Sequence, residues 1–115
     1  MTDLETLKLA WDAALAKKAQ HPVILDLRKI SRITDYFLIV SAENTIQVKA
    51  IADHIDEILN QNGLQALRCE GYQSGRWILL DYGFLVIHVF HRVEREFYLL
   101  EQLWHDAAPI EFPQN

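Results

Sequence analysis

The stretch that decides the fold is Gly75–Leu103, GRWILLDYGFLVIHVFHRVEREFYLLEQL, where the chain concentrates its aromatic and branched apolar residues. Two apolar runs within it, Trp77–Leu80 and Phe84–Phe90, are separated by the short break Asp81-Tyr82-Gly83. Such runs, rich in β-branched and aromatic residues and joined by a break that contains glycine, are typical of adjacent strands. The stretch therefore predicts a hairpin, followed directly by a helix over Glu94–Trp104. The inward residues of this helix would be Phe97, Leu100, Leu103 and Trp104.

Two amphipathic helices are predicted before the hairpin. The first has apolar residues at spacings of three and four over Leu4–Leu15, with Thr2 or Asp3 as its cap. The second has the same pattern over Val48–Leu59 and begins at Asn44 or Thr45. It ends at Asn62-Gly63, because glycine readily takes the left-handed conformation that is common at helix ends.

Three further strands complete the predicted sheet: Val23–Leu27, Tyr36–Val40 and Leu64–Glu70. The resulting order αββαβββα implies an α/β fold in which helices pack on a mixed five-stranded sheet. A right-handed crossover through the second helix would make the second and third strands parallel. We expect a single domain over residues 1–106 and, because of Pro109 and Pro113, a frayed tail over residues 107–115.

Composition and charge narrow the possible functions. A chain of 115 residues, of which 50% are hydrophobic, fits one domain with its own core. The net charge of −5 argues against direct nucleic-acid binding, whether general or sequence-specific, because affinity for phosphate backbones comes mainly from clustered Lys and Arg. The single Cys69 excludes an internal disulfide and fits a reducing compartment, so we expect a cytoplasmic protein. No apolar run approaches the roughly 18 residues of a membrane span.

Motifs for catalysis or metal binding are weak in this sequence. His88 and His91 lie three apart in a predicted strand and therefore point to opposite faces, which argues against a shared metal ion, with or without His54 or Cys69. The sequence has neither a G-x-S-x-G elbow nor the glycine spacing of a phosphate-binding loop. Asp81 ends an apolar strand, where catalytic acids and turn residues are both common, and its nearness to Gly83 favours the turn. We predict no enzymatic activity, no cofactor and no metal.

The aromatic residues of the hairpin are more informative. In a strand, Trp77, Leu79 and Asp81 share one face, while Ile78, Leu80 and Tyr82 share the other. If helices cover only one face completely, the other presents an aromatic and aliphatic patch of the kind that dominates protein interfaces. Arg76 adjoins this patch in the sequence. Whether Trp77 is a core residue or an exposed anchor stays open at this point.

Several blocks in order closely resemble the Iojap family, the ribosomal silencing factors. They are Thr34–Ile39, Gln47–Asp53, Trp77–Gly83, Val86–Phe90 and Phe97–Trp104. The resemblance implies a topology similar to that of nucleotidyltransferases without their activity. In agreement, Ser41 follows Val40 rather than the glycine of a Gly-Ser turn, and the sequence has no Asp-x-Asp pair to hold Mg²⁺.

The resemblance also implies a function. Members of this family bind the fourteenth protein of the large ribosomal subunit, block joining to the small subunit sterically and lower translation when nutrients are scarce. An acidic chain suits a basic ribosomal partner. Carried over onto this sequence, the contact residues are Trp77, Ile78, Asp81, Tyr82 and His88, to which we add Arg76 from its position. The family usually has an acid where this chain has Phe84, which removes a negative charge beside the expected surface.

Two alternatives come from other classes of protein. A small nucleotidyl- or phosphoryl-transfer enzyme would use acids such as Asp81 and Glu94, and would require a divalent metal and a nucleotide. A homodimerisation module would bury the same aromatic patch against a second copy of the chain.

Overall fold

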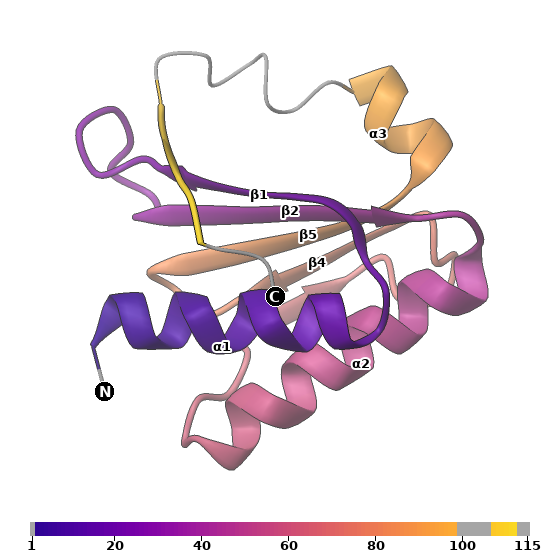
Figure 1. The fold of residues 1–115 in the computed structure, drawn as a ribbon, viewed down its shortest axis with the longest axis horizontal. Coiled ribbons are helices and arrows are strands. Elements are labelled where there is room, and N and C mark those ends of the chain that lie inside the picture. The colour runs from indigo at the N-terminus through magenta and orange to yellow at the C-terminus, as the bar shows by residue number, and fades with distance from the viewer. Residues whose placement is uncertain (1, 99–106, 113–115) are drawn as a thin grey trace.

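A mixed sheet with two long helices on one of its faces forms the fold, as Figure 1 shows. The computed structural model describes residues 2–98 and 107–112. The elements in chain order are α1 (Asp3–Ala16), β1 (Gln20–Asp26), β2 (Tyr36–Ala42), α2 (Thr45–Gln61), β3 (Arg68–Glu70), β4 (Trp77–Asp81), β5 (Leu85–His91), α3 (Arg92–Tyr98) and β6 (Ala108–Ile110).

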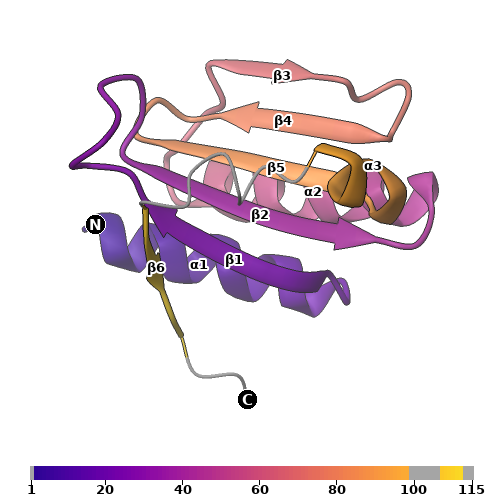
Figure 2. The same cartoon turned by 90° about the horizontal axis from the view of Figure 1, so that it is seen from above.

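The sheet has the strand order β3-β4-β5-β2-β1-β6, which Figure 2 shows from above. The predicted hairpin is confirmed, since β4 and β5 pair antiparallel with Ile78 opposite Val89. The central pair β2 and β5 is parallel, and the remaining neighbours are antiparallel. Strand β3 therefore runs in the same direction as β2, as the crossover predicts, although β5 and β4 lie between them.

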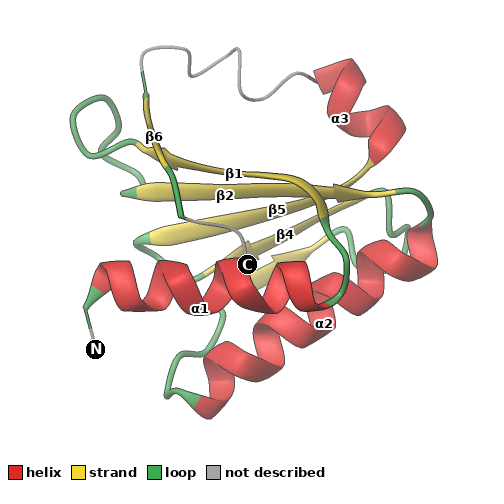
Figure 3. Ribbon diagram, in the orientation of Figure 1, coloured by secondary structure: helices red, strands yellow, loops and turns green. Residues whose placement is uncertain are grey.

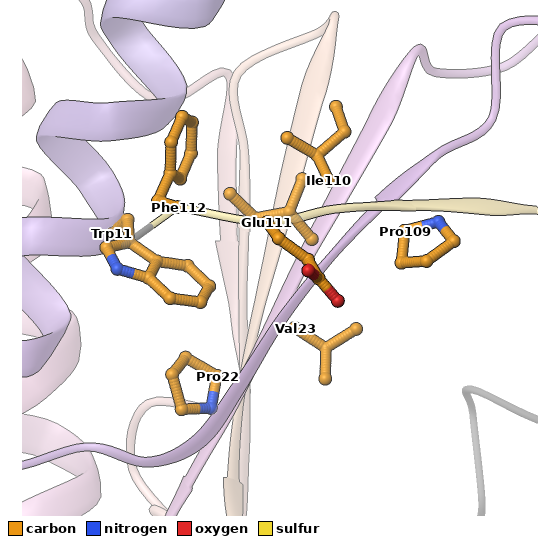
Figure 4. Close-up of a pocket in the computed structure, with 8 residues that line it drawn as sticks. Trp11, Pro22, Val23, Pro109, Ile110, Glu111 and Phe112 are labelled. Atoms are coloured by element: carbon orange, nitrogen blue, oxygen red, sulfur yellow. The ribbon is translucent and has the colours of Figure 1, made fainter. Parts of the chain in front are cut away.

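The sheet contains six strands rather than the five predicted. The sixth, β6, lies within residues 107–115, which the sequence predicts to be frayed, and it pairs with β1 so that Ile110 lies opposite Ile24. Pro109 is compatible with this position because β6 is an edge strand, where a missing N–H is tolerated. Phe112 follows the strand and meets the Trp11 ring edge-on, with ring centroids 5.7 Å apart. Figure 4 shows this segment beside α1. The two line a hollow of about 290 Å³.

The two long helices begin where the sequence predicts. The Thr2 hydroxyl accepts from the Glu5 N–H, while the Glu5 carboxylate accepts from the Thr2 N–H, which is a capping box. The Asn44 side chain caps α2 by accepting from the Gln47 N–H. The buried face of α2 is the predicted apolar stripe: Val48, Ile51, Ala52, Ile55 and Leu59.

The two faces of the sheet differ in what packs against them. Figure 3 shows α1 and α2 together on one face, which we call the α1/α2 face, and α3 on the other, which we call the α3 face. The main core lies on the α1/α2 face. A smaller apolar cluster lies on the α3 face and is built on Leu25, Leu27, Ile39 and Phe90.

The inward side of α3 differs from the prediction. Phe97 was expected to face the core, but 79% of its surface is exposed. Arg95 is the buried residue instead, and its guanidinium donates to the Gln20 carbonyl and the Ser41 hydroxyl. Two helical residues that are two positions apart lie about 200° apart around the axis, so they cannot both face inward. The other predicted inward residues, Leu100, Leu103 and Trp104, lie outside the described residues.

Candidate functional site

The candidate site lies on the α3 face, where alternate residues of β4 and β5 meet. In β4, Ile78 and Leu80 are buried on the α1/α2 face, whereas Trp77, Leu79 and Asp81 are only partly buried. The predicted division of this strand into two faces is therefore confirmed. The β5 residues that share the α3 face are Val86, His88 and Phe90, which pair across the strands with Asp81, Leu79 and Trp77.

Trp77 is held by contacts on three sides. Its ring lies 4.8 Å, centroid to centroid, from Phe90 in a stacked arrangement, and at the same distance from Tyr98 of α3 in a tilted one. Its indole N–H donates to Nδ1 of His88 over 3.1 Å. Trp77 is thus half-buried on the α3 face, and belongs to the smaller apolar cluster there rather than to the main core.

His88 lies at the centre of this face and is 4% exposed. Phe37 of β2 packs edge-on against its ring, at a centroid distance of 4.5 Å. Burial lowers the pKa of His88 to about 4, because the charged imidazolium loses its hydration there, so the ring is neutral at pH 7. Its Nε2 atom is buried and has no hydrogen-bond partner among the described residues.

A hollow of about 380 Å³ opens beside His88. The segments before β2 and before β3 supply two exposed apolar residues to its wall, Ile33 with 91% and Leu67 with 72% of its surface accessible. The remaining described residues of the lining are Ser31, Thr34, Phe37, Arg68, Leu79, Asp81, Gly83, Val86 and His88. The hollow is therefore mainly apolar, with a few polar groups at defined positions.

Asp81 lies in the wall of the hollow at the start of the β4–β5 turn. Its Oδ1 accepts from the Gly83 N–H over 2.8 Å, and its Oδ2 accepts from Nε of Arg68 over 3.2 Å. The first of these bonds supports the turn interpretation, because Asp side chains commonly accept from the backbone two residues on. The second places one cation beside the carboxylate, at an exposed position.

Ile78 and Tyr82 do not lie on the α3 face. Ile78 is fully buried on the α1/α2 face, and Tyr82 is 7% exposed there. The Tyr82 hydroxyl donates to a carboxylate oxygen of Asp56 in α2 over 2.6 Å. Burial, with the hydrogen bond to Asp56 second, raises the pKa of Tyr82. These two residues fix β4 to α2, while Trp77, Asp81 and His88 are brought together on the other face.

Arg76 lies at the edge of the site, directly before β4. Its guanidinium forms two hydrogen bonds with the carboxylate of Glu94 in α3, one of them from Nη2 over 2.9 Å. This ion pair joins the start of β4 to α3. Glu94 is therefore paired with Arg76. The transferase alternative would instead need Glu94 beside Asp81.

Phe84, which stands where the family usually has an acid, packs against the core of the α1/α2 face. It therefore adds no apolar surface to the α3 face. Within residues 2–98 and 107–112, no group of three or more His, Cys, Asp or Glu side chains is arranged to hold a metal ion. Over the same residues, no helix has the length and apolar character needed to cross a membrane.

Several residues of the hollow were not predicted from the sequence. Phe37 pairs with Val86 and lies on the α3 face. Because side chains alternate along a strand, its side of β2 could have been predicted from the sequence. Ile33 and Leu67 come from irregular segments, where no periodicity shows which way a side chain points.

Comparisons with known proteins agree on one family. A family model described as "Ribosomal silencing factor during starvation" matches residues 1–115. A ribosomal silencing factor of Halalkalibacterium halodurans is 43% identical over 111 residues, which cover 96% of this chain and 95% of that protein. The ribosomal silencing factor of Bacillus subtilis is 42% identical over 117 residues, covering 100% and 99%. A crystal structure of a protein from Chromobacterium violaceum has a TM-score of 0.89 at 30% identity, covering 99% of this chain and 92% of that one. The resemblance found in the sequence is thereby confirmed.

Proposed function

The chain belongs to the ribosomal silencing factor family, and we propose that it binds the large ribosomal subunit through that subunit's fourteenth protein. By occupying this surface in the cytoplasm, it blocks joining to the small subunit sterically and lowers translation when nutrients are limiting. The mechanism is occlusion and includes no catalytic step. The observation that carries the proposal is the α3 face itself, where Asp81 and His88 lie in the wall of an apolar hollow and Trp77 is hydrogen-bonded to His88.

The composition of this face supports a protein partner. Tryptophan and arginine are enriched among the residues that dominate binding energy, and they act best in pockets surrounded by apolar contacts. Trp77 is held in one position by Phe90, Tyr98 and His88, so little side-chain freedom is lost when it is covered. The net charge of −5 favours encounter with a basic ribosomal protein.

Of the six residues predicted from the sequence, we assign direct contact to Trp77, Asp81 and His88, with Arg76 at the edge. Ile78 and Tyr82 contribute indirectly, because their contacts with the core of the α1/α2 face hold β4 in place. We also infer that the sheet keeps the nucleotidyltransferase-like topology implied by the family resemblance, without that activity.

The test compares two isoleucines that are both exposed but lie in different places. Ile33 stands in the wall of the hollow with 91% of its surface accessible, and Ile46 lies on α2 with 80% accessible. Neither contributes to the buried core, so both Ile33→Ala and Ile46→Ala should fold as the wild type does.

Binding to purified large subunits is measured by co-sedimentation. If a partner covers Ile33, its truncation removes about 1–2 kcal/mol of apolar burial, which is about a 5- to 30-fold loss of affinity. Ile46→Ala should bind as the wild type does. Equal affinity of the two variants would refute the assignment of the surface, and sedimentation only with joined ribosomes would refute occlusion.

A further inference from the structure

The ring nitrogens of His88 have distinct roles that follow from its contact with Trp77. An indole N–H is a donor only, so Nδ1 of His88 must accept this hydrogen bond without carrying a proton. In a neutral imidazole the proton then lies on Nε2. His88 is therefore a hydrogen-bond donor at Nε2, and the tautomer is fixed by Trp77.

This Nε2–H group has no acceptor among the described residues, although it is buried. Buried donors without an acceptor are uncommon in folded proteins, and each one calls for an explanation. Phe37 and Phe90, which lie beside the ring, offer no side-chain acceptor. His88 also forms part of the wall of the hollow, so a partner that fills the hollow and displaces the atoms covering Nε2 can bring an acceptor to this ring.

The charges around the hollow restrict the kind of acceptor. Asp81 places a carboxylate in the same wall. Its partner Arg68 has its side chain 59% exposed to solvent, where screening weakens the pair. A second carboxylate in the hollow would be repelled by Asp81. A neutral carbonyl group in the hollow would not be repelled by Asp81, and a Lys or Arg side chain next to that carbonyl would be attracted to Asp81.

The apolar part of the lining restricts the occupant further. Ile33, Leu67 and Val86 surround the hollow, which at about 380 Å³ lies at the small end of the range for ligand pockets. One apolar side chain and the peptide group next to it suit such a space. A basic protein that inserts an apolar residue satisfies the charge, the apolar wall and the open donor together.

We propose that the Nε2–H of His88 donates a hydrogen bond to a main-chain carbonyl of the basic ribosomal partner, in a segment whose apolar side chain fills the hollow. This inference rests on the proposed function. His88 thereby joins two elements of the interface, since it positions the Trp77 indole through Nδ1 and binds the partner through Nε2.

Binding of the purified fourteenth protein of the large subunit by two variants of His88 tests this assignment. His88→Phe keeps an aromatic ring but removes both hydrogen bonds, and should weaken binding about tenfold or more. His88→Gln can accept from Trp77 through its carbonyl and donate through its amide, so it should restore most of that affinity. Wild-type affinity of His88→Phe, alongside weaker binding of Ile33→Ala, would overturn the inference and leave the proposed function standing. Wild-type affinity of both variants would overturn the proposed function as well.

Nitrogen-15 NMR of the wild-type chain gives a readout that does not depend on whether the variants fold. The His88 Nε2–H resonance should change on addition of the fourteenth protein, while Nδ1 keeps the shift of an unprotonated acceptor. An Nε2–H resonance unchanged in the bound state would overturn the inference. If a second copy of this chain occupied the hollow, the resonance would shift with rising concentration of the chain alone, and the proposal would fall.

Discussion

The stability of the domain depends on pH because His88 is buried in its neutral form. Its pKa is lowered from 6.5 to about 4 in the folded protein by desolvation. Between these two values the unfolded chain binds a proton that the folded protein does not, so acid favours unfolding. The free energy of unfolding should therefore be largest above pH 6.5 and should fall as the pH drops towards 4. At pH 5 the loss relative to pH 7 amounts to about 2 kcal/mol.

Urea unfolding at pH 7 and pH 5 measures this loss directly, when the wild type is compared with His88→Gln. The variant lacks the titrating ring, and the other ionisable groups contribute nearly equally to both proteins. The wild type should lose about 2 kcal/mol more than the variant over this interval. An equal pH dependence of the two proteins would show that His88 is protonated in the folded state or is reached by water, and would contradict the burial argument.

Two matched pairs of substitutions test the scaffold of the site. In Gly71→Ala the new Cβ would lie 2.0 Å from the Trp77 carbonyl oxygen at a φ of +80°, which should cost about 2–5 kcal/mol in urea unfolding. Gly63→Ala, at a φ of +86° with no atom within 4 Å, should cost only about 1–2 kcal/mol, and equal losses would contradict the predicted clash. Tyr82→Phe removes a part-buried hydrogen bond to a carboxylate of α2 and should cost about 1.5–3 kcal/mol. Tyr72→Phe removes a similar but exposed bond and should change stability by less than about 1 kcal/mol, so a larger loss there would count against burial as the cause.

Several predicted elements agree with the structure because their apolar patterns are long. The runs of β2, β4 and β5 and the stripe of α2 are long enough for their pattern to exceed the background of the chain. Alternation also assigned Trp77 and Asp81 to one face and Ile78 to the other, because successive side chains of a strand point to opposite sides.

Elements that depend on long-range pairing were not predictable in the same way. Strand β6 has three residues, one of which is proline, and becomes a strand only because β1 offers it an edge. Strand β3 is also three residues long rather than the seven predicted, since the ladder with β4 is formed by Arg68–Glu70. The hollow depends on Ile33 and Leu67, whose positions are set by tertiary packing rather than by any local pattern.

The chemistry at position 88 separates the requirements of folding from those of binding. Strand β5 is central in the sheet, and its other α3-face residues, Val86 and Phe90, are apolar. A histidine between them lowers the stability of the folded protein, because its ring is desolvated and its Nε2–H finds no acceptor among the described residues. An apolar ring would fill the same space without this cost, although the Trp77 indole would then lose its acceptor. The bond from Trp77 accounts for the Nδ1 acceptor, but nothing in the packing of the described part of the chain accounts for the buried Nε2–H. This group is explained if the partner supplies the acceptor. The hydrogen bond that is missing in the free protein then forms in the complex and contributes to the affinity.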